Sequence, residues 1–420
     1  MDLLLLVVAL SVLAWVLLSR WLARVSVTAP ITLVVAGALT FSVLQQHLPP
    51  KGTGDGVRVV AEYALVFVLF GDASRISFAW LRERAQLPAR LLLVGLPLSI
   101  LLGILVAAGL FPDAGPWVVA IIGAALAPTD AALGSSVMTD PRVPRQVRRV
   151  LNVESGLNDG LATPFVLFFI SAALASEERL SVASAVASAA AQLVGGVTLG
   201  LVVGAGGAAA LRWVSQRGWI DHAVIQLGVF TLPVIAYAGS VELRANGFVA
   251  AFVAGIAFGN VARALPSPSL DFVEDSGAVL ALVVWFVFGA FVADALPGAA
   301  WGPALAYALV SLTVVRMLPV GLALLGSGVA RRDRWVVGWL GPRGLASVVF
   351  ALLALDDLGT EGRLVVQVVG VTVLASVFLH GLTAVPIART YGRTGGSEAV
   401  TEAEPVRRPT PWRRRLNPSP

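Results

Sequence analysis

Apolar segments long enough to cross a membrane recur along almost the whole chain. Hydrophobic residues make up 57% of the 420 residues and charged residues only 13%, whereas a soluble domain carries about 25% charged residues. An α-helix needs about 20 mostly apolar residues to span the hydrocarbon core. The sequence therefore predicts an all-α polytopic membrane protein. The thirteen predicted spans lie near residues 2–19, 30–44, 57–78, 90–111, 116–137, 147–175, 184–211, 221–238, 245–262, 274–294, 301–325, 334–355 and 364–388.

The distribution of basic residues predicts the orientation. Of the 30 Lys and Arg residues, 23 fall in the C-terminal segment and the loops after odd-numbered spans, and only 5 fall on the other side. Since cytoplasmic loops carry the basic excess, we expect an outside N-terminus and a cytoplasmic C-terminus in the cell membrane. Asp2 precedes the first span and Arg20 follows it, which favours a retained helix over a signal peptide. The polar residues 391–420 predict a disordered cytoplasmic tail, which could touch anionic headgroups.

One predicted span carries two acids within an otherwise apolar run. Glu154, Ser155, Asn158 and Asp159 fall within about 140° of a helix at 100° per residue, and so form one polar stripe. Acids at membrane depth are costly and mark functional sites by default. The stripe is therefore the first candidate site.

Two other spans are interrupted by proline and glycine. Pro128 precedes Thr129 and Asp130 in the fifth span, and Pro342 lies within Gly341–Gly344 in the twelfth. Interrupted spans at matching positions in the two halves of a chain indicate an inverted-repeat transporter, with its binding site near the midplane of the membrane. Thr129 can then offer a carbonyl to a cation, and Asp130 is expected to cap the second half-helix of its own span. A simple proline kink is the alternative.

Three further charges need partners. Arg316 lies within the eleventh span without an acid nearby in sequence, so we pair it with Glu154. Arg343 is the second choice of partner for Glu154. Arg343 is expected near the half-helix C-termini, where a cation is favoured. Asp72, near the cytoplasmic end of the third span, is either a ligand or a local partner of Arg75.

Together these motifs resemble the NhaP-type monovalent cation:proton (Na⁺/H⁺) antiporters. The resemblance covers nearly all of residues 1–390 and implies a homodimer with an antiporter domain over that range. It implies a core of spans 4–6 and 11–13, with spans five and twelve crossing as broken helices, and a dimerisation part of spans 1–3 and 7–10. The family often has an acid directly after a Phe in the third span, where this chain has Gly71 and then Asp72.

The resemblance also implies functional residues. The implied Na⁺ (or Li⁺) ligands are Asp159, Ser155, the Thr129 carbonyl and a span-three acid, here Asp72, and we place Asn158 of the same stripe with them. Asp130, Glu154, Arg316 and Arg343 are expected to be structural or charge-compensating.

The expected mechanism is exchange at one shared carboxylate. Asp159 can hold H⁺ or a cation but not both, and Asn158 does not titrate, so we expect electroneutral 1:1 exchange. A K⁺/H⁺ antiporter of the same fold is the alternative. A channel would need a continuous filter, and an organic-anion transporter would need more core arginines. Three scattered His and no HExxH motif speak against an intramembrane enzyme. We expect no cofactor and no nucleic-acid partner.

Overall fold

The computed structural model describes residues 2–24, 27–44, 55–78, 82, 85–130, 135–138, 140–177, 182–262 and 270–394. Within these ranges the ordered elements are helices without any strand, which confirms the all-α class. Residues 391–394, predicted as the start of the disordered tail, are helical, and the rest of that predicted tail, from residue 395 on, lies outside the described residues. The helices are α1 (Asp2–Arg24), α2 (Ala29–Leu44), α3 (Asp55–Ser74), α5 (Gln86–Arg90), η1 (Leu91–Gly95), α6 (Leu96–Leu110), α7 (Pro116–Ala125), α8 (Ser135–Met138), α9 (Arg145–Glu177), α10 (Val182–Gln216), α11 (His222–Glu242), α12 (Gly247–Val261), α13 (Asp271–Ala295), α14 (Trp301–Val310), η4 (Ser311–Val315), α15 (Arg316–Ala323), α16 (Arg331–Trp339), α17 (Leu345–Leu358) and α18 (Thr360–Thr394).

Each predicted span coincides with a helix or with a short series of helices. The fifth span divides into α7 and α8, and the twelfth into α16 and α17. In the described part of the chain, eight helices are long and apolar enough to cross a membrane, and further apolar helices of 10–17 residues accompany them. The protein therefore spans the membrane several times, and the count of thirteen crossings stays a prediction.

Two spans contain a π-helical turn that the apolar pattern did not predict. The turn η1 separates α5 from α6, and η4 separates α14 from α15. A π-turn inserts extra backbone into a helix and is common at functional sites. Here η4 ends immediately before Arg316, so it sets the direction in which that side chain leaves the helix.

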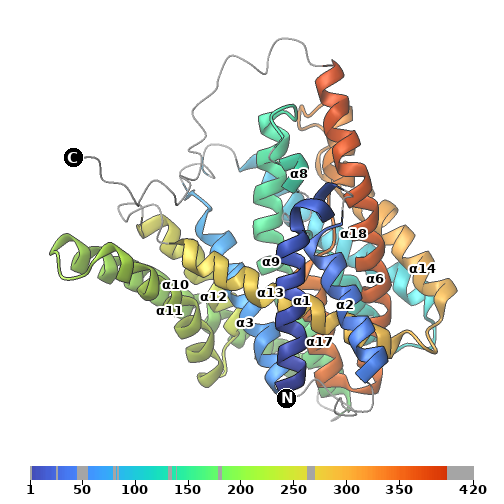
Figure 1. Ribbon diagram of the computed structural model, residues 1–420, viewed down its shortest axis with the longest axis horizontal. Helices are drawn as coiled ribbons and strands as arrows, with labels where there is room; N and C mark the ends of the chain where they lie inside the picture. The colour runs from blue at the N-terminus through green and yellow to red at the C-terminus, as the bar shows by residue number, and fades with distance from the viewer. Residues whose placement is uncertain are drawn as a thin grey trace.

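The helices pack into two groups (Figure 1). Helices α10, α11 and α12 lie together on one side of the molecule, and α6, α14 and α18 lie on the other. Helices α2 and α3 pack against α13, and α3 also packs against α12, while α17 packs against α18 and α7 against α6 and α9. Contacts of α3 with α9 and α17 connect the two groups, and the division into dimerisation and core spans stays a prediction.

Glycines allow some of these helices to touch through their backbones. A Cβ added to Gly37 of α2 would lie 1.8 Å from the Phe286 carbonyl oxygen of α13. One added to Gly289 of α13 would lie 2.1 Å from the Val34 carbonyl oxygen of α2. Small residues permit such close approach between membrane helices, so these two positions fix the distance between α2 and α13.

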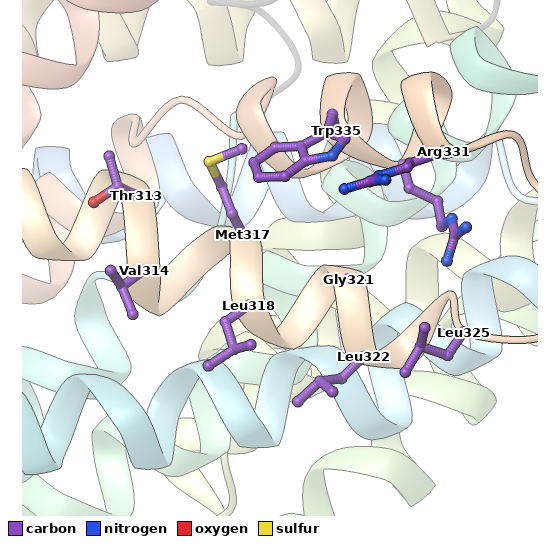
Figure 2. A pocket seen from close by; sticks show the side chains of 10 residues that line it. Thr313, Val314, Met317, Leu318, Gly321, Leu322, Leu325, Arg331 and Trp335 are labelled. Carbon is purple, nitrogen blue, oxygen red and sulfur yellow. The ribbon is translucent and has the colours of Figure 1, made fainter.

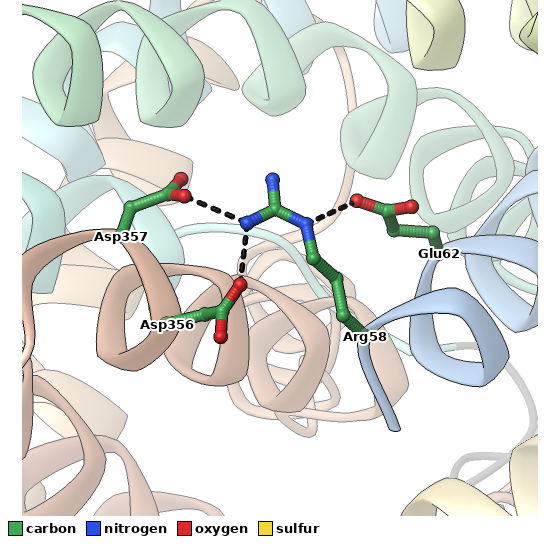
Figure 3. Close-up of polar contacts among 4 residues, drawn as sticks. All are labelled: Arg58, Glu62, Asp356 and Asp357. Carbon is green, nitrogen blue, oxygen red and sulfur yellow. Dashed lines mark hydrogen bonds and ion pairs between the residues drawn. The ribbon is translucent and has the colours of Figure 1, made fainter. Parts of the chain in front are cut away.

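Ion pairs connect the two groups at one end of the molecule. Figure 3 shows Arg58, at the start of α3, between Glu62 of the same helix and Asp356 and Asp357 near the end of α17. Arg58 Nη1 lies 2.7 Å from Asp357 Oδ1, and Arg58 Nε lies 2.9 Å from Glu62 Oε1. Five residues after α17 ends, Arg363 of α18 pairs with Asp294 of α13 at 2.9 Å. The pairs of Arg58 with the two aspartates of α17, and the pair of Arg363 with Asp294, join helices of one group to helices of the other.

Candidate functional site

The two interrupted segments meet in the interior. Helix α7 ends at Ala125, and α17 begins at Leu345 after the break that follows α16. The Asp130 amide donates to the Pro342 carbonyl at 2.8 Å, so backbone groups freed by one break are satisfied by the other. Polar backbone at membrane depth is tolerated when it is buried in protein in this way.

Asp130 caps α17, a helix other than the second half of its own span. Its Oδ2 accepts a hydrogen bond from the Leu345 amide at 3.2 Å, at the N-terminus of α17. The second half-helix of its own span is α8 (Ser135–Met138), and residues 131–134, where the predicted cap falls, lie outside the described part of the chain. A carboxylate at a helix N-terminus offsets the positive end of the helix dipole. Asp130 therefore links the two breaks through its side chain as well as its backbone.

Arg343 lies at the C-terminal end of α7, as the sequence predicted. Its side chain is fully buried, and Nη1 donates to the carbonyls of Ala127 at 2.8 Å and Pro128 at 3.0 Å. Its backbone amide donates to Ser376 Oγ of α18 at 2.8 Å. The guanidinium therefore brings positive charge to carbonyl oxygens that the end of α7 leaves without helical partners.

The break in the fifth span faces the polar stripe of α9. Asn158 Nδ2 donates to Thr129 Oγ1 at 2.7 Å, and Thr129 Oγ1 lies 3.2 Å from Ser155 Oγ. Asp159 is on the same stripe and is only 8% exposed. Within the described residues, Asp159 Oδ1 and Asn158 Oδ1 are buried oxygens without a hydrogen-bond partner. The stripe thus presents oxygen atoms that can accept a proton or coordinate a cation.

A narrow pocket brings these residues together with the start of α17. Asp159, Thr129 and Asp130 line it, together with Ser347. The Ser347 hydroxyl is fully buried and has no hydrogen-bond partner in the part of the chain described. Ser347 was not among the residues predicted for the site. Its position, three residues after the Gly341–Gly344 break, is the sequence feature that could have indicated it. Its hydroxyl adds one more oxygen to the candidate site.

The predicted contact between Glu154 and Arg316 is present. Arg316 Nη1 lies 2.6 Å from Glu154 Oε1, and the two side chains are 6% and 4% exposed. A buried charge needs a partner of opposite sign because burial removes its hydration. Glu154 is thereby engaged by an arginine and is distinguished from Asp159 on the same helix.

Asp72 of α3 lies beside the stripe. A Cβ added to Gly156 would lie 3.6 Å from the Asp72 Cβ, so α3 and α9 are in contact at this point. Asp159 is within electrostatic range of both Asp72 and Asp130. The side chain of Arg75 pairs with Glu274 of α13, so this arginine is engaged by another helix and not by Asp72, which was one of the two alternatives for Asp72.

Crossing broken helices beside a buried stripe of polar side chains define a membrane protein with an ion-antiporter fold. The solved sodium proton antiporter MjNhaP1 from Methanocaldococcus jannaschii has this fold. It superposes with a TM-score of 0.73 over 93% of this chain and 99% of that chain, at 19% sequence identity. The Sodium/hydrogen exchanger, transmembrane family matches residues 7–390, and the chain belongs to that family.

Two further relatives share about a quarter of their aligned residues with this chain. The Na(+)/H(+) antiporter NhaP of Pseudomonas aeruginosa is 27% identical over 395 residues, covering 85% of this chain and 89% of that protein. The K(+)/H(+) antiporter NhaP2 of Shewanella sp. strain ANA-3 is 25% identical over 333 residues, covering 79% of this chain. The chain spans 57% of the length of the latter protein.

Proposed function

We propose that this protein exchanges Na⁺ (or Li⁺) for H⁺ across the cell membrane, with one cation per proton. The observation that carries the proposal is the buried Asp159 carboxylate, whose Oδ1 lacks a hydrogen-bond partner within the described residues. A carboxylate in this setting can be neutralised by a proton or by a cation, but not by both at once. Alternating exposure of one such site to the two sides of the membrane exchanges the two ions.

The remaining stripe residues complete the ion site. We assign Ser155, Asn158 and the Thr129 carbonyl as oxygen ligands beside Asp159, because hydrogen bonds of 2.7 and 3.2 Å hold Asn158 and Ser155 against the Thr129 side chain. Hydroxyl, amide and carboxylate oxygens suit a hard cation. Asp72 completes the set from α3 across the contact with Gly156. Asp130, Glu154, Arg316 and Arg343 hold the site in place and compensate its charge.

Movement between the two helix groups supplies the alternating access. In this proposal the core comprises spans 4–6 and 11–13, and it moves against the dimerisation part of spans 1–3 and 7–10 in a homodimer. The Asp159 site lies where α9 of the core faces α3 of the other group. The proposed orientation has the N-terminus outside and the C-terminus in the cytoplasm, as the 23 basic residues on one side favour.

K⁺/H⁺ exchange is the second candidate. Relatives of similar identity carry both names, since one at 27% identity is a Na(+)/H(+) antiporter and one at 25% is a K(+)/H(+) antiporter. Both functions use the same shared carboxylate, so the choice concerns the cation and leaves the mechanism unchanged.

Proteoliposomes with an imposed pH gradient test the proposal. Na⁺, Li⁺ and K⁺ are added in turn, and collapse of the gradient is followed with a pH-sensitive dye. Na⁺ or Li⁺ is expected to collapse the gradient at lower concentration than K⁺. Collapse by K⁺ alone would select the second candidate, and no collapse by any of the three would refute exchange.

A further inference from the structure

A hollow lies away from the ion site, on the outer face of α15 and α16. It has a volume of about 560 Å³ and is lined by Met317, Leu318, Leu322, Trp335, Arg331 and Arg334, among others. Figure 2 shows the apolar side chains following α15 toward Leu325, with Trp335 above Met317 and Arg331 at one end. We call this hollow the α15 groove.

The apolar part of the groove belongs to a membrane-crossing segment. It follows the chain from Thr313 to Leu325, about 18 Å at 1.5 Å per residue. The candidate span Trp301–Ala323 contains most of this stretch. Leu318 is 50% exposed and Leu322 47%. Since the surroundings of such a face are acyl chains, the groove offers an apolar surface to a lipid tail.

The other end of the groove carries positive charge. Arg331 and Arg334 are three residues apart on the first turn of α16 and so lie on one face of the helix. Arg334 Nε is buried without a hydrogen-bond partner among the described residues. Nearby, Arg90 donates to the Leu325 carbonyl at 2.7 Å. Arginine forms strong paired hydrogen bonds with phosphate oxygens.

The other charges on this turn are directed elsewhere. Asp333 Oδ1 accepts a hydrogen bond from the Tyr391 hydroxyl at 2.7 Å, and Arg332 Nη2 donates to Thr390 Oγ1 at 2.8 Å. Both contacts are with α18. The carboxylate of Asp333, the acid on this turn, is therefore directed to a neighbouring helix.

We propose that the α15 groove binds one anionic phospholipid, with its phosphate between Arg331 and Arg334 and an acyl chain along Leu318 and Leu322. Charge complementarity selects this occupant. The chain's own segment 395–420 is a poor competitor because it contains five arginines. A zwitterionic lipid fits the apolar part equally well but adds an ammonium group near the arginines. The proposal concerns a lipid site and does not depend on the transported ion.

Native mass spectrometry of the purified protein tests the site. Phosphatidylglycerol and phosphatidylcholine are offered in equal amounts, and the fraction of protomers carrying each lipid is measured. Two variants change opposite ends of the groove. Arg331→Gln with Arg334→Gln removes the charge, and Gly321→Leu fills the apolar part at a position where an added Cβ meets nothing within 4 Å.

Matched controls make the same chemical changes elsewhere. Arg20→Gln with Arg212→Gln removes two charges from other helices, and Gly302→Leu adds a side chain at another open helical position. Thermal melting in detergent checks that each variant is folded. Because the two groove variants change different residues, each tests the lipid site without the other. A further variant ends the chain at residue 394.

The expected result is selective binding of phosphatidylglycerol by the wild-type protein. Occupancy should fall at least fivefold in both groove variants, and it should stay at the wild-type level in both controls and in the shortened chain. Equal occupancy by the two lipids would overturn the proposal, and so would wild-type occupancy in a folded groove variant. Higher occupancy in the shortened chain would show that the C-terminal segment fills the groove.

Discussion

Arg316 Nη1 lies 2.6 Å from Glu154 Oε1, and both side chains are shielded from the surroundings. Removing one partner strands a buried charge, which costs ~3–5 kcal/mol. Glu154→Ala and Arg316→Ala should therefore each lower thermal stability in detergent strongly, and the double variant should lose less than the sum of the two. Alanine substitutions in the more exposed Arg363–Asp294 pair should each lower the free energy of unfolding by only about 0–1 kcal/mol. Additive losses at Glu154 and Arg316 would show that the two residues are not coupled.

Gly344→Ala should destabilise the crossing of the two breaks. A Cβ at this position would lie 1.9 Å from Asp130 Oδ2, so either Asp130 or the loop must move. The backbone of Gly344 has φ −137°, and the cost is therefore steric. We expect a loss of about 1–3 kcal/mol, typical of overpacking, together with slower exchange. Gly321→Ala, where an added Cβ meets nothing within 4 Å, is the control and should leave both stability and exchange near the wild-type level.

The ion pairs at one end of the molecule should hold that end closed. Arg58 joins α3 to α17, and Arg363 joins α18 to α13 (Figure 3 shows the Arg58 cluster). The chain has no Cys, so Ser347→Cys provides a single thiol in the ion-site pocket. Arg58→Gln with Arg363→Gln should speed labelling of this thiol severalfold by a membrane-impermeant maleimide added from the Arg58 side. Arg75→Gln breaks a pair between α3 and α13, which belong to one group, and should leave labelling unchanged. If labelling in the double variant matches the wild type, the pairs do not close that end.

Much of this arrangement could be predicted from the sequence because charge is so rare in it. Glu154 and Asp159 stand out in an apolar run, and their helical spacing places both on the stripe that faces Thr129. Likewise, the Pro128 and Pro342 breaks predicted the crossing that the 2.8 Å bond from Asp130 to Pro342 now describes. Proline and buried acids are strong local signals because each has few tolerated environments in a membrane.

Other features depend on contacts that local patterns do not encode. The turns η1 and η4 keep the apolar composition of their spans, so hydrophobicity carried no sign of the change in helical pitch. Arg75 and Glu274 are 199 residues apart, and only the packing of α3 on α13 makes them partners. Asp130 caps α17 because the crossing of the two breaks brings the N-terminus of that helix next to it, although the two lie far apart in the sequence.

Exchange should carry no net charge. Asn158 does not titrate, and Glu154 is engaged by Arg316, which leaves Asp159 as the shared group of the stripe. If a second proton moved, a potential of 100 mV would change the driving force by about 2.3 kcal/mol, which is more than tenfold in the equilibrium ratio. We therefore expect the zero-flux Na⁺ gradient at fixed ΔpH to stay constant when K⁺ and valinomycin clamp the voltage of proteoliposomes. A shift with voltage would assign a second titrating role to Asp72 or Asp130.

The most direct test of the account is ΔpH-driven cation exchange by Asp159→Asn in proteoliposomes, at the same protein density as the wild type. Asp140→Asn is the control. Asp140 lies outside the membrane-spanning helices, and hydrogen bonds from Arg142 hold its pKa below its usual value. It stays charged at neutral pH without facing the ion site. The account predicts that Asp159→Asn is folded and inserted but indistinguishable from protein-free liposomes, while Asp140→Asn exchanges normally. Exchange by Asp159→Asn within tenfold of the wild-type rate would contradict the claim that Asp159 is the site shared by cation and proton.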